Sequence, residues 1–400
     1  MPRLLKNDQI VQRIAKQLGV AGLANLADGA EQTNLTELLA DKLSGSDLHS
    51  LLLAVLKRRV GKVEPSRLVE ASSVSKACDL DARLMNRVES IAYGQAEEFD
   101  AVELSPVVPL GSVARLAQLD QGNVLSTIRG FECASDPTIG MALECVRRRK
   151  KTADRRETTK LCSSQRVLRF PQPDNPAFTS HFKLFAMVSA GRDSGSFAFE
   201  LAALREQIDF YLRFVSKLSE GGFAFEDIVV ELSDTAVVAA LCAKFDIDRG
   251  TIRKMVRARE HDSSDKVLEQ YANLWPKSLT GEGSDFAQLN LSQHLPKHLI
   301  ERLKKLEVVV CQGLSSKHNQ VRFRFNLHRL TGLSYYHGPC FHIKMKNQAG
   351  DNFMLADGGF VDWTQLLLGD NKERLMTSAI GTELICRLFR KKSQAGGGDN

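Results

Sequence analysis

The chain has 400 residues, which is enough for two or three domains and one large core. A hydrophobic fraction of 43% and a charged fraction of 26% are typical of globular proteins and exclude a largely disordered chain. A net charge of +6 favours polyanionic partners only weakly, so nucleic acid is permitted but not indicated. No apolar run reaches the length of a signal sequence or a membrane span. We therefore expect a soluble cytoplasmic protein with no membrane partner.

The cysteines and histidines give little support for a metal site. The eight cysteines are scattered and contain no Cys-x-x-Cys pair, which favours buried reduced thiols. His294 and His298 have the spacing of a zinc-binding helix pair, but Pro296 between them disfavours a helix. His337 and His342 lie at uneven spacing on an aromatic strand. We interpret all four histidines as ordinary residues and expect no metal ligand set.

The N-terminal part has a helical pattern. Apolar residues recur at helical spacing over 8–59, where Ser46 or Asp47 is suited to cap the last helix and Gly61 to end it. Pro65 is suited to begin a further short helix. We predict an N-terminal helical domain over residues 1–75.

From residue 82 onward, strand patterns dominate. A helix is predicted over 82–93 and another over 199–218. Strands are predicted over 99–106, 124–128, 167–170, 181–188, 225–232 and 321–325. Because these strands are separated by long segments, they must pair non-locally around one core. The pattern predicts an α+β fold with a mixed, mainly antiparallel sheet flanked by helices.

The most informative stretch is 330–385. We interpret it as a strand entering a Gly/aromatic pocket edge, a second strand ending in a Gly-Gly turn, and a helix led by glycine. The residues that mark these features are Tyr335, Tyr336, Gly338, Gly358, Gly359 and Gly381. Adjacent tyrosines before a glycine supply flat walls with hydrogen-bonding tips.

This succession resembles the end of the catalytic domain of histidyl-tRNA synthetase and its paralogues, including the regulatory paralogue of histidine biosynthesis. The family has an Arg-Gly-Leu-Asp-Tyr-Tyr-Thr-Gly segment, a Gly-Gly-Gly-Arg-Tyr-Asp turn and a Gly-x-Glu-Arg-Leu helix start. The present chain keeps the frame but not all of the functional side chains. Thr331, Phe360 and Leu384 stand in place of arginines, and Ser334 stands in place of the aspartate.

Two earlier segments resemble further parts of the same class II synthetase family. The strand 99–106 resembles the first class II motif, whose proline lies at a dimer interface, so the resemblance implies a homodimer with Pro106 near the interface. The segment 135–138 resembles an Arg-Pro-Glu-x-Thr motif whose acid and threonine face the amino acid. The resemblance therefore implies ligand contacts for Asp136 and Thr138, although Asp136 can equally be a simple helix cap.

The strand, loop and strand over 167–188 resemble the second class II motif. Arg169 occupies the position of its arginine, whose planar fork suits a carboxylate and an α-phosphate together, while Arg166 is a second candidate. Pro171 replaces the glutamate of the motif. Because several anchors are replaced, we expect ordinary histidine activation to be lost unless Arg329 or Arg387 compensates.

The resemblance also implies the domain plan. We predict a synthetase-like core over 76–240 and 320–390, interrupted by a helical insertion over 241–319 and followed by a disordered tail over 391–400. The resemblance therefore leads us to expect no anticodon-binding domain after residue 390. The basic run 147–151 and the arginines of the insertion are read as solvated surfaces, with phosphate binding as the alternative.

Three functions remain open at this point. The first is a pseudo-synthetase that binds an amino acid, nucleotide or aminoacyl ligand. The second is an unconventional ligase that adenylates another acid with ATP and magnesium, and the third is an accessory protein that binds RNA or other nucleic acid. The predicted ligand site comprises Asp136, Thr138, Arg169, Tyr335, Tyr336, Gly338, Gly358, Gly359 and Gly381, with Arg169 in the catalytic role if the site is active.

Overall fold

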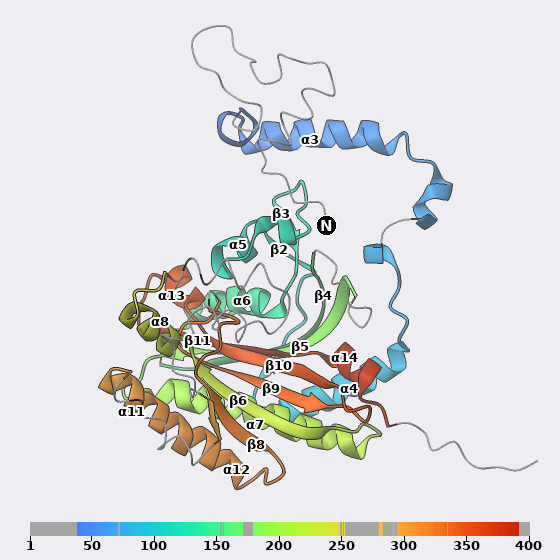
Figure 1. Ribbon diagram of the computed structural model, residues 1–400. Helices are drawn as coiled ribbons and strands as arrows, with labels where there is room; N and C mark the ends of the chain where they lie inside the picture. The colour runs from blue at the N-terminus through green and yellow to red at the C-terminus, as the bar shows by residue number, and fades with distance from the viewer. Residues whose placement is uncertain are drawn as a thin grey trace, which may run out of the picture. The chain divides into compact units, whose positions relative to one another are not determined.

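The structure is a computed structural model that describes residues 38–70, 73–152, 154, 156–170, 179–248, 250, 252, 280–282, 291, 294–333 and 335–391 (Figure 1). The chain divides into two compact units. One comprises residues 1–72 with 127–130, and the other comprises 73–126 with 131–400. Each unit is described by itself.

In the smaller unit the described helices are η1 (Leu38–Lys42), α3 (Gly45–Val60) and η2 (Pro65–Glu70). The predicted helix end at Gly61 and the short helix beginning at Pro65 are confirmed. The predicted cap is wrong by two or three residues, because the Ser44 hydroxyl accepts the hydrogen bond from the Asp47 backbone N–H at 3.1 Å. The predicted helical pattern before residue 38 lies outside the described residues.

The larger unit is built on a nine-stranded sheet in the order β1-β4-β5-β11-β10-β9-β6-β8-β7. The strands are β1 (Asp100–Ala101), β4 (Thr159–Leu168), β5 (His181–Arg192), β6 (Glu226–Asp234), β7 (Thr280–Glu282), β8 (Arg322–Asn326), β9 (Pro339–Lys346), β10 (Asn352–Val361) and β11 (Glu373–Ile380). Among the described strands of this sheet, only the pairs β1/β4 and β6/β8 are parallel. The predicted mixed, mainly antiparallel α+β fold is confirmed.

Helices cover both faces of this sheet (Figure 1). They are α4 (Ala82–Gln95), α5 (Ser112–Leu116), α6 (Pro137–Lys151), α7 (Ala198–Glu220), α8 (Thr235–Lys244), α11 (Lys297–Leu306), α12 (Gly313–Ser315), α13 (Trp363–Leu368) and α14 (Thr382–Leu388), with short turns η3 (Ser73–Ser75), η4 (Gln121–Asn123) and η8 (Glu307–Gln312). None of the described helices is both long and apolar enough to pass through a membrane.

The two faces have separate apolar cores, because successive side chains of a strand point to opposite sides. Ala186 and Val188 of β5 pack with residues of α6 and with Trp363 of α13, and we call this side the front face. Phe185 and Met187 pack with residues of α4 and α7, and we call this side the back face.

Two predicted strands are much shorter than expected. In the segment 99–106 only β1 pairs with β4, and the chain then runs in extended form to a small two-stranded sheet made of β2 (Val107–Pro109) and β3 (Phe131–Cys133). In the segment 124–128 only Ser126 forms an isolated bridge. Alternation therefore overestimated the length of both strands.

The Gly-Gly pair was predicted at a turn and instead lies inside β10, paired with strands on both sides. Glycine occupies these two positions because a side chain would not fit there. A Cβ on Gly358 would lie 2.5 Å from the Ser378 Cβ, and one on Gly359 would lie 2.5 Å from the Cys340 Cβ. Neighbouring side chains press so closely on this strand that only glycine fits.

Candidate functional site

The N-terminus of α6 holds the first pair of predicted site residues. Asp136 is the N-cap, and its Oδ1 accepts hydrogen bonds from the Thr138 backbone N–H at 3.0 Å and the Thr138 hydroxyl at 2.7 Å. Thr138 is 2% exposed, whereas the Asp136 side chain is 21% exposed. The capping role that the sequence left open is therefore present, and Asp136 still reaches solvent beside it.

Arg169 lies immediately after β4 and next to this cap. Its Nε donates to the Ser135 carbonyl at 2.8 Å, and its Nη2 lies 3.4 Å from Oδ2 of Asp136. The guanidinium stacks over the ring of Phe182, 5.2 Å from the ring centroid. Its side chain remains 47% exposed, so the cation is held in place while part of its donor fork faces solvent.

The two tyrosines complete a continuous group on the front face. The Tyr335 hydroxyl lies 3.2 Å from the Thr138 hydroxyl, and its ring packs edge-on against Tyr336 and Trp363. Burial raises the pKa of both tyrosines well above the usual value, so both stay protonated at neutral pH. We call Asp136, Thr138, Arg169, Tyr335 and Tyr336 the front-face cluster.

A second polar group continues from Tyr336. Arg329 is buried, and its Nη2 donates to Asp357 Oδ1 at 3.0 Å while its guanidinium stacks 5.4 Å from the Tyr336 ring centroid. His342 Nε2 lies 3.6 Å from the same Asp357 oxygen, and Glu231 lies 4.0 Å from His342 Nδ1. The sequence analysis considered Arg329 and His342 but did not identify Asp357 or Glu231.

Charges in this second group keep the acids ionised and the histidine neutral. Burial acts to raise the pKa of Asp357, but Arg329 and His342 outweigh it and lower the value. Burial also opposes ionisation of Glu231, yet Lys344 and Arg324 lower its pKa. For His342, burial and then Arg329 lower the pKa to about 4 despite the two nearby carboxylates. Arg329 is thus a buried cation whose charge is balanced by its ion pair with Asp357.

The predicted glycines do not share one location. A Cβ on Gly359 would meet the Tyr336 ring at 2.6 Å, so Gly359 lies against the front-face cluster. Gly358 abuts Phe341 of the back-face core instead. Gly338 exchanges hydrogen bonds with Thr235, at 2.8 Å and 3.0 Å. Gly381 precedes α14, and its N–H donates to the Leu355 carbonyl at 3.0 Å.

The replaced positions, at which the resembled family has arginines or acidic residues, do not supply charged side chains to this site. Thr331 accepts the hydrogen bond of Arg329 Nε through its carbonyl at 2.9 Å. Phe360 and Leu384 pack with the back-face core, and Phe360 contacts Phe199 at a centroid distance of 6.3 Å. Ser334 and Pro171 lie outside the described residues.

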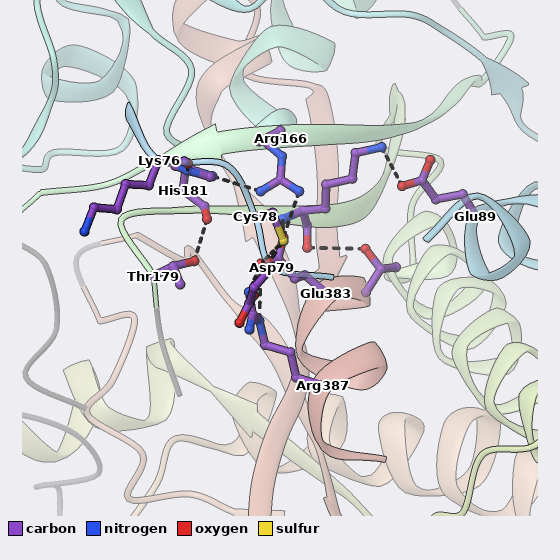
Figure 2. Close-up of polar contacts among 11 residues, drawn as sticks. Lys76, Cys78, Asp79, Glu89, Arg166, Thr179, His181, Glu383 and Arg387 are labelled. Carbon is purple, nitrogen blue, oxygen red and sulfur yellow. Dashed lines mark hydrogen bonds and ion pairs between the residues drawn. The ribbon is translucent and has the colours of Figure 1, made fainter. Parts of the chain in front are cut away.

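Arg166 and Arg387, which were considered as alternative cations, form ion pairs with other carboxylates (Figure 2). Arg166 shares the face of Cys162 on β4, which is the back face, and its Nη2 pairs with Glu383 Oε2 at 2.9 Å. Arg387 pairs with Glu383 at 3.0 Å and with Asp79 at 2.5 Å. Arg166 therefore does not occupy the site of Arg169, and Arg387 is bound by two carboxylates.

The segment before α4 contacts Glu383 and His181 on the back face (Figure 2). The Cys78 thiol donates to Glu383 Oε1 at 3.3 Å, and the Lys183 backbone N–H donates to Oε2 at 3.2 Å. His181 lies 2.9 Å from Arg166 and 2.7 Å from the Lys76 carbonyl. Since a guanidinium only donates and a carbonyl only accepts, His181 accepts at Nδ1 and donates from Nε2.

The basic run at the end of α6 is largely used in internal ion pairs. Arg149 is buried, and its Nε donates to Glu373 at 2.6 Å. Arg148 pairs with Glu144 at 3.0 Å and with Asp100 at 2.7 Å. Two of its arginines thus stabilise the fold, and this weakens the phosphate-binding interpretation of the run.

Solved structures of similar architecture include histidyl-tRNA synthetases and a related regulatory subunit. An ATP phosphoribosyltransferase regulatory subunit/histidyl-tRNA synthetase from Bacillus halodurans matches with a TM-score of 0.57 and 16% identity, over 79% of this chain and 82% of that chain. The chain has a histidyl-tRNA synthetase-like fold. Histidyl-tRNA synthetase from Nostoc sp. PCC 7120 matches with a TM-score of 0.55 and 16% identity, over 79% and 74% of the two chains.

A histidine–tRNA ligase subunit from Alicyclobacillus acidocaldarius matches this histidyl-tRNA synthetase-like fold over 95% of its own chain and 79% of this one, with a TM-score of 0.55 and 14% identity. No protein-family model matches the chain, and no curated protein matches it. At these identities the likeness establishes the fold, and the chemistry has to be argued from the side chains.

Proposed function

We propose that this protein binds a small ligand with an amino-acid headgroup at the front-face cluster and does not activate histidine in the ordinary way. The observation that carries the proposal is the juxtaposition of Asp136, Thr138, Arg169 and Tyr335 around the N-terminus of α6. A carboxylate and a guanidinium held side by side and partly exposed suit the ammonium and carboxylate of one ligand.

The roles follow from what each side chain can donate or accept. Asp136 Oδ2 takes no part in the cap, lies 3.4 Å from Arg169 Nη2 and can also accept from an ammonium. The part of the Arg169 fork that is not bonded to Ser135 can donate to a carboxylate. Tyr335 remains protonated and offers a hydroxyl and a ring edge to the rest of the ligand.

The cations support binding more than adenylate formation. Adenylation needs positive groups aimed at the charge that develops on phosphate. Arg329 is bonded to Asp357 and Thr331, and Arg387 is bonded to Glu383 and Asp79. Among the described residues, Arg169 is the cation of this cluster that keeps exposed donors. Losing one stabilising donor costs orders of magnitude in rate, so we expect negligible histidine activation.

Binding is tested by titrating each of the twenty amino acids, and ATP, into the protein by calorimetry. We expect one amino acid or a small set to bind. A hydrogen bond to a charged group contributes about 1.5–3 kcal/mol, so Arg169→Ala should weaken binding roughly 10- to 100-fold. Tyr335→Phe should weaken it less, because only the hydroxyl is lost.

Arg213→Ala is the matched control, since Arg213 is 44% exposed and lies on α7 at the back face. It should leave the affinity unchanged. Equal affinities for the wild type, Arg169→Ala and Arg213→Ala would contradict the assignment of the site.

The runner-up is an unconventional ligase that uses ATP with magnesium. The described residues support adenylation poorly, because Arg329 is held against Asp357 and Arg387 is held against Glu383 and Asp79. ATP-dependent pyrophosphate exchange that disappears in Arg169→Ala would favour the ligase. Tight, salt-dependent RNA binding without amino-acid binding would favour a nucleic-acid accessory protein.

A further inference from the structure

A cavity of about 460 Å³, lined by no residue of the front-face cluster, lies where the N-terminus of α7 meets α11 and the ends of β9 and β10. Its volume falls within the range of small-molecule sites. The charged side chains that line it are Asp193, Glu200, Arg302, His337, Asp362 and Arg374. Gly338, which the sequence placed in the ligand cleft with the tyrosines, also lines this cavity.

Charged groups of both signs in this cavity lack hydrogen-bond partners within the described part of the chain. Glu200 is 6% exposed; its Oε1 accepts from Arg374 at 2.8 Å, but its Oε2 has no partner. Asp362 Oδ1 has none either, and its Oδ2 lies 3.7 Å from His337. Buried acceptors left in this way cost about 1–3 kcal/mol each, so a partner is expected.

The cationic side of the cavity is Arg302. It pairs with the buried Asp234 at 2.5 Å and stacks 5.4 Å from the centroid of Phe197, but its Nε makes no hydrogen bond within the described residues. Its side chain is 21% exposed and lines the cavity. A partly exposed guanidinium attracts a carboxylate.

The start of α7 adds to this positive end. The helix has 23 residues, and its N-cap is Phe197, whose side chain makes no capping hydrogen bond. Ser196 and Phe197 have φ values of 52° and 68°, which are unusual for residues other than glycine. The Ala198 N–H donates to the Gly195 carbonyl at 3.0 Å, and the helix N-terminus carries partial positive charge.

From these contacts we propose that the cavity is a second site, for a small zwitterion of the α-amino-acid type. The ligand carboxylate meets Arg302 and the start of α7, and the ligand ammonium donates to Glu200 and Asp362. The unpaired atoms of Glu200, Asp362 and Arg302 are closed to water, so these side chains must rotate to meet the ligand. The proposal stands independently of the function assigned to the front-face cluster.

The test uses calorimetric titration of the full chain with each of the twenty amino acids, with acetate and ethylamine as probes that carry one charge only. We expect an amino acid to bind at least tenfold more tightly than either probe. Glu200→Gln keeps an acceptor for Arg374 but replaces the unpaired oxygen with a donor, and it should weaken this binding at least tenfold. Asp362→Asn should do the same.

Glu220→Gln is the matched control, because Glu220 lies on the same helix with a side chain that is 64% exposed. It should bind like the wild type, and Arg169→Ala should retain this binding event. A loss in Arg169→Ala with none in Glu200→Gln or Asp362→Asn would assign the binding to the front-face cluster and overturn the proposal. Absence of amino-acid binding, or an equal loss in Glu220→Gln, would also overturn it.

Discussion

Replacing His342 with glutamine should remove part of the acid sensitivity of the fold. His342 is 8% exposed, and its pKa in the folded protein is about 4. A histidine in an unfolded chain has a pKa near 6.5. Between these values the unfolded chain binds a proton that the folded protein does not, so stability falls as the pH drops from about 6.5 to about 4.

The expected size follows from the same two values. At about 1.4 kcal/mol for each pH unit inside this window, His342 should remove about 2 kcal/mol of unfolding free energy between pH 7.5 and pH 5. Below about pH 4 the folded form also takes up the proton and the loss stops growing. Asp357 and Glu231 have lowered pKa values, so they stay ionised through this range.

Urea unfolding followed by circular dichroism at pH 7.5 and pH 5 measures this effect. The wild type should lose about 2 kcal/mol more than His342→Gln over the interval. His298→Gln, at an exposed position on α11, serves as the control and should behave like the wild type. Equal losses in the wild type and His342→Gln would refute the inference that His342 is held neutral by burial.

Three further predictions concern packing and assembly. Gly359→Ala places a Cβ 2.5 Å from a neighbouring side chain, so it should lower the free energy of unfolding in urea by about 1–3 kcal/mol. The control Gly94→Ala in α4, where a Cβ would meet nothing within 4 Å, should raise it by up to about 1 kcal/mol. Equal effects of the two substitutions would contradict the packing around Gly359. Arg149→Ala strands the buried Glu373 and should cost about 3–5 kcal/mol, and a loss below 1 kcal/mol would contradict a structural role. Light scattering at micromolar concentration should give a homodimer through the region 99–106, and a monomer would contradict it.

Parts of the sheet were predictable because apolar and polar residues alternate along some of its strands. Alternation over 225–232 and 321–325 correctly predicted β6 and β8. The prediction of a turn at Gly358 and Gly359 was wrong because adjacent glycines usually indicate a turn, whereas both lie inside β10. Their place inside the strand is decided by aromatic rings on both faces, and these contacts are not encoded in local sequence.

Part of the candidate site could be predicted from the sequence. The short spacing from Asp136 to Thr138 predicted a cap, and the structure adds the contact from Thr138 to Tyr335, which is 197 positions away. The pairing of Arg329 with Asp357 depends on the register of β9 and β10 and on the loop before them, which no local pattern specifies.

The central claim is ligand binding without ordinary activation, and an ATP–pyrophosphate exchange assay tests it most directly. The assay is run on the wild type with magnesium and each of the twenty amino acids, beside calorimetric binding of the same amino acids. We predict binding of at least one amino acid that Arg169→Ala weakens, and exchange at background for all twenty. Exchange well above background with histidine, abolished in Arg169→Ala, would contradict it.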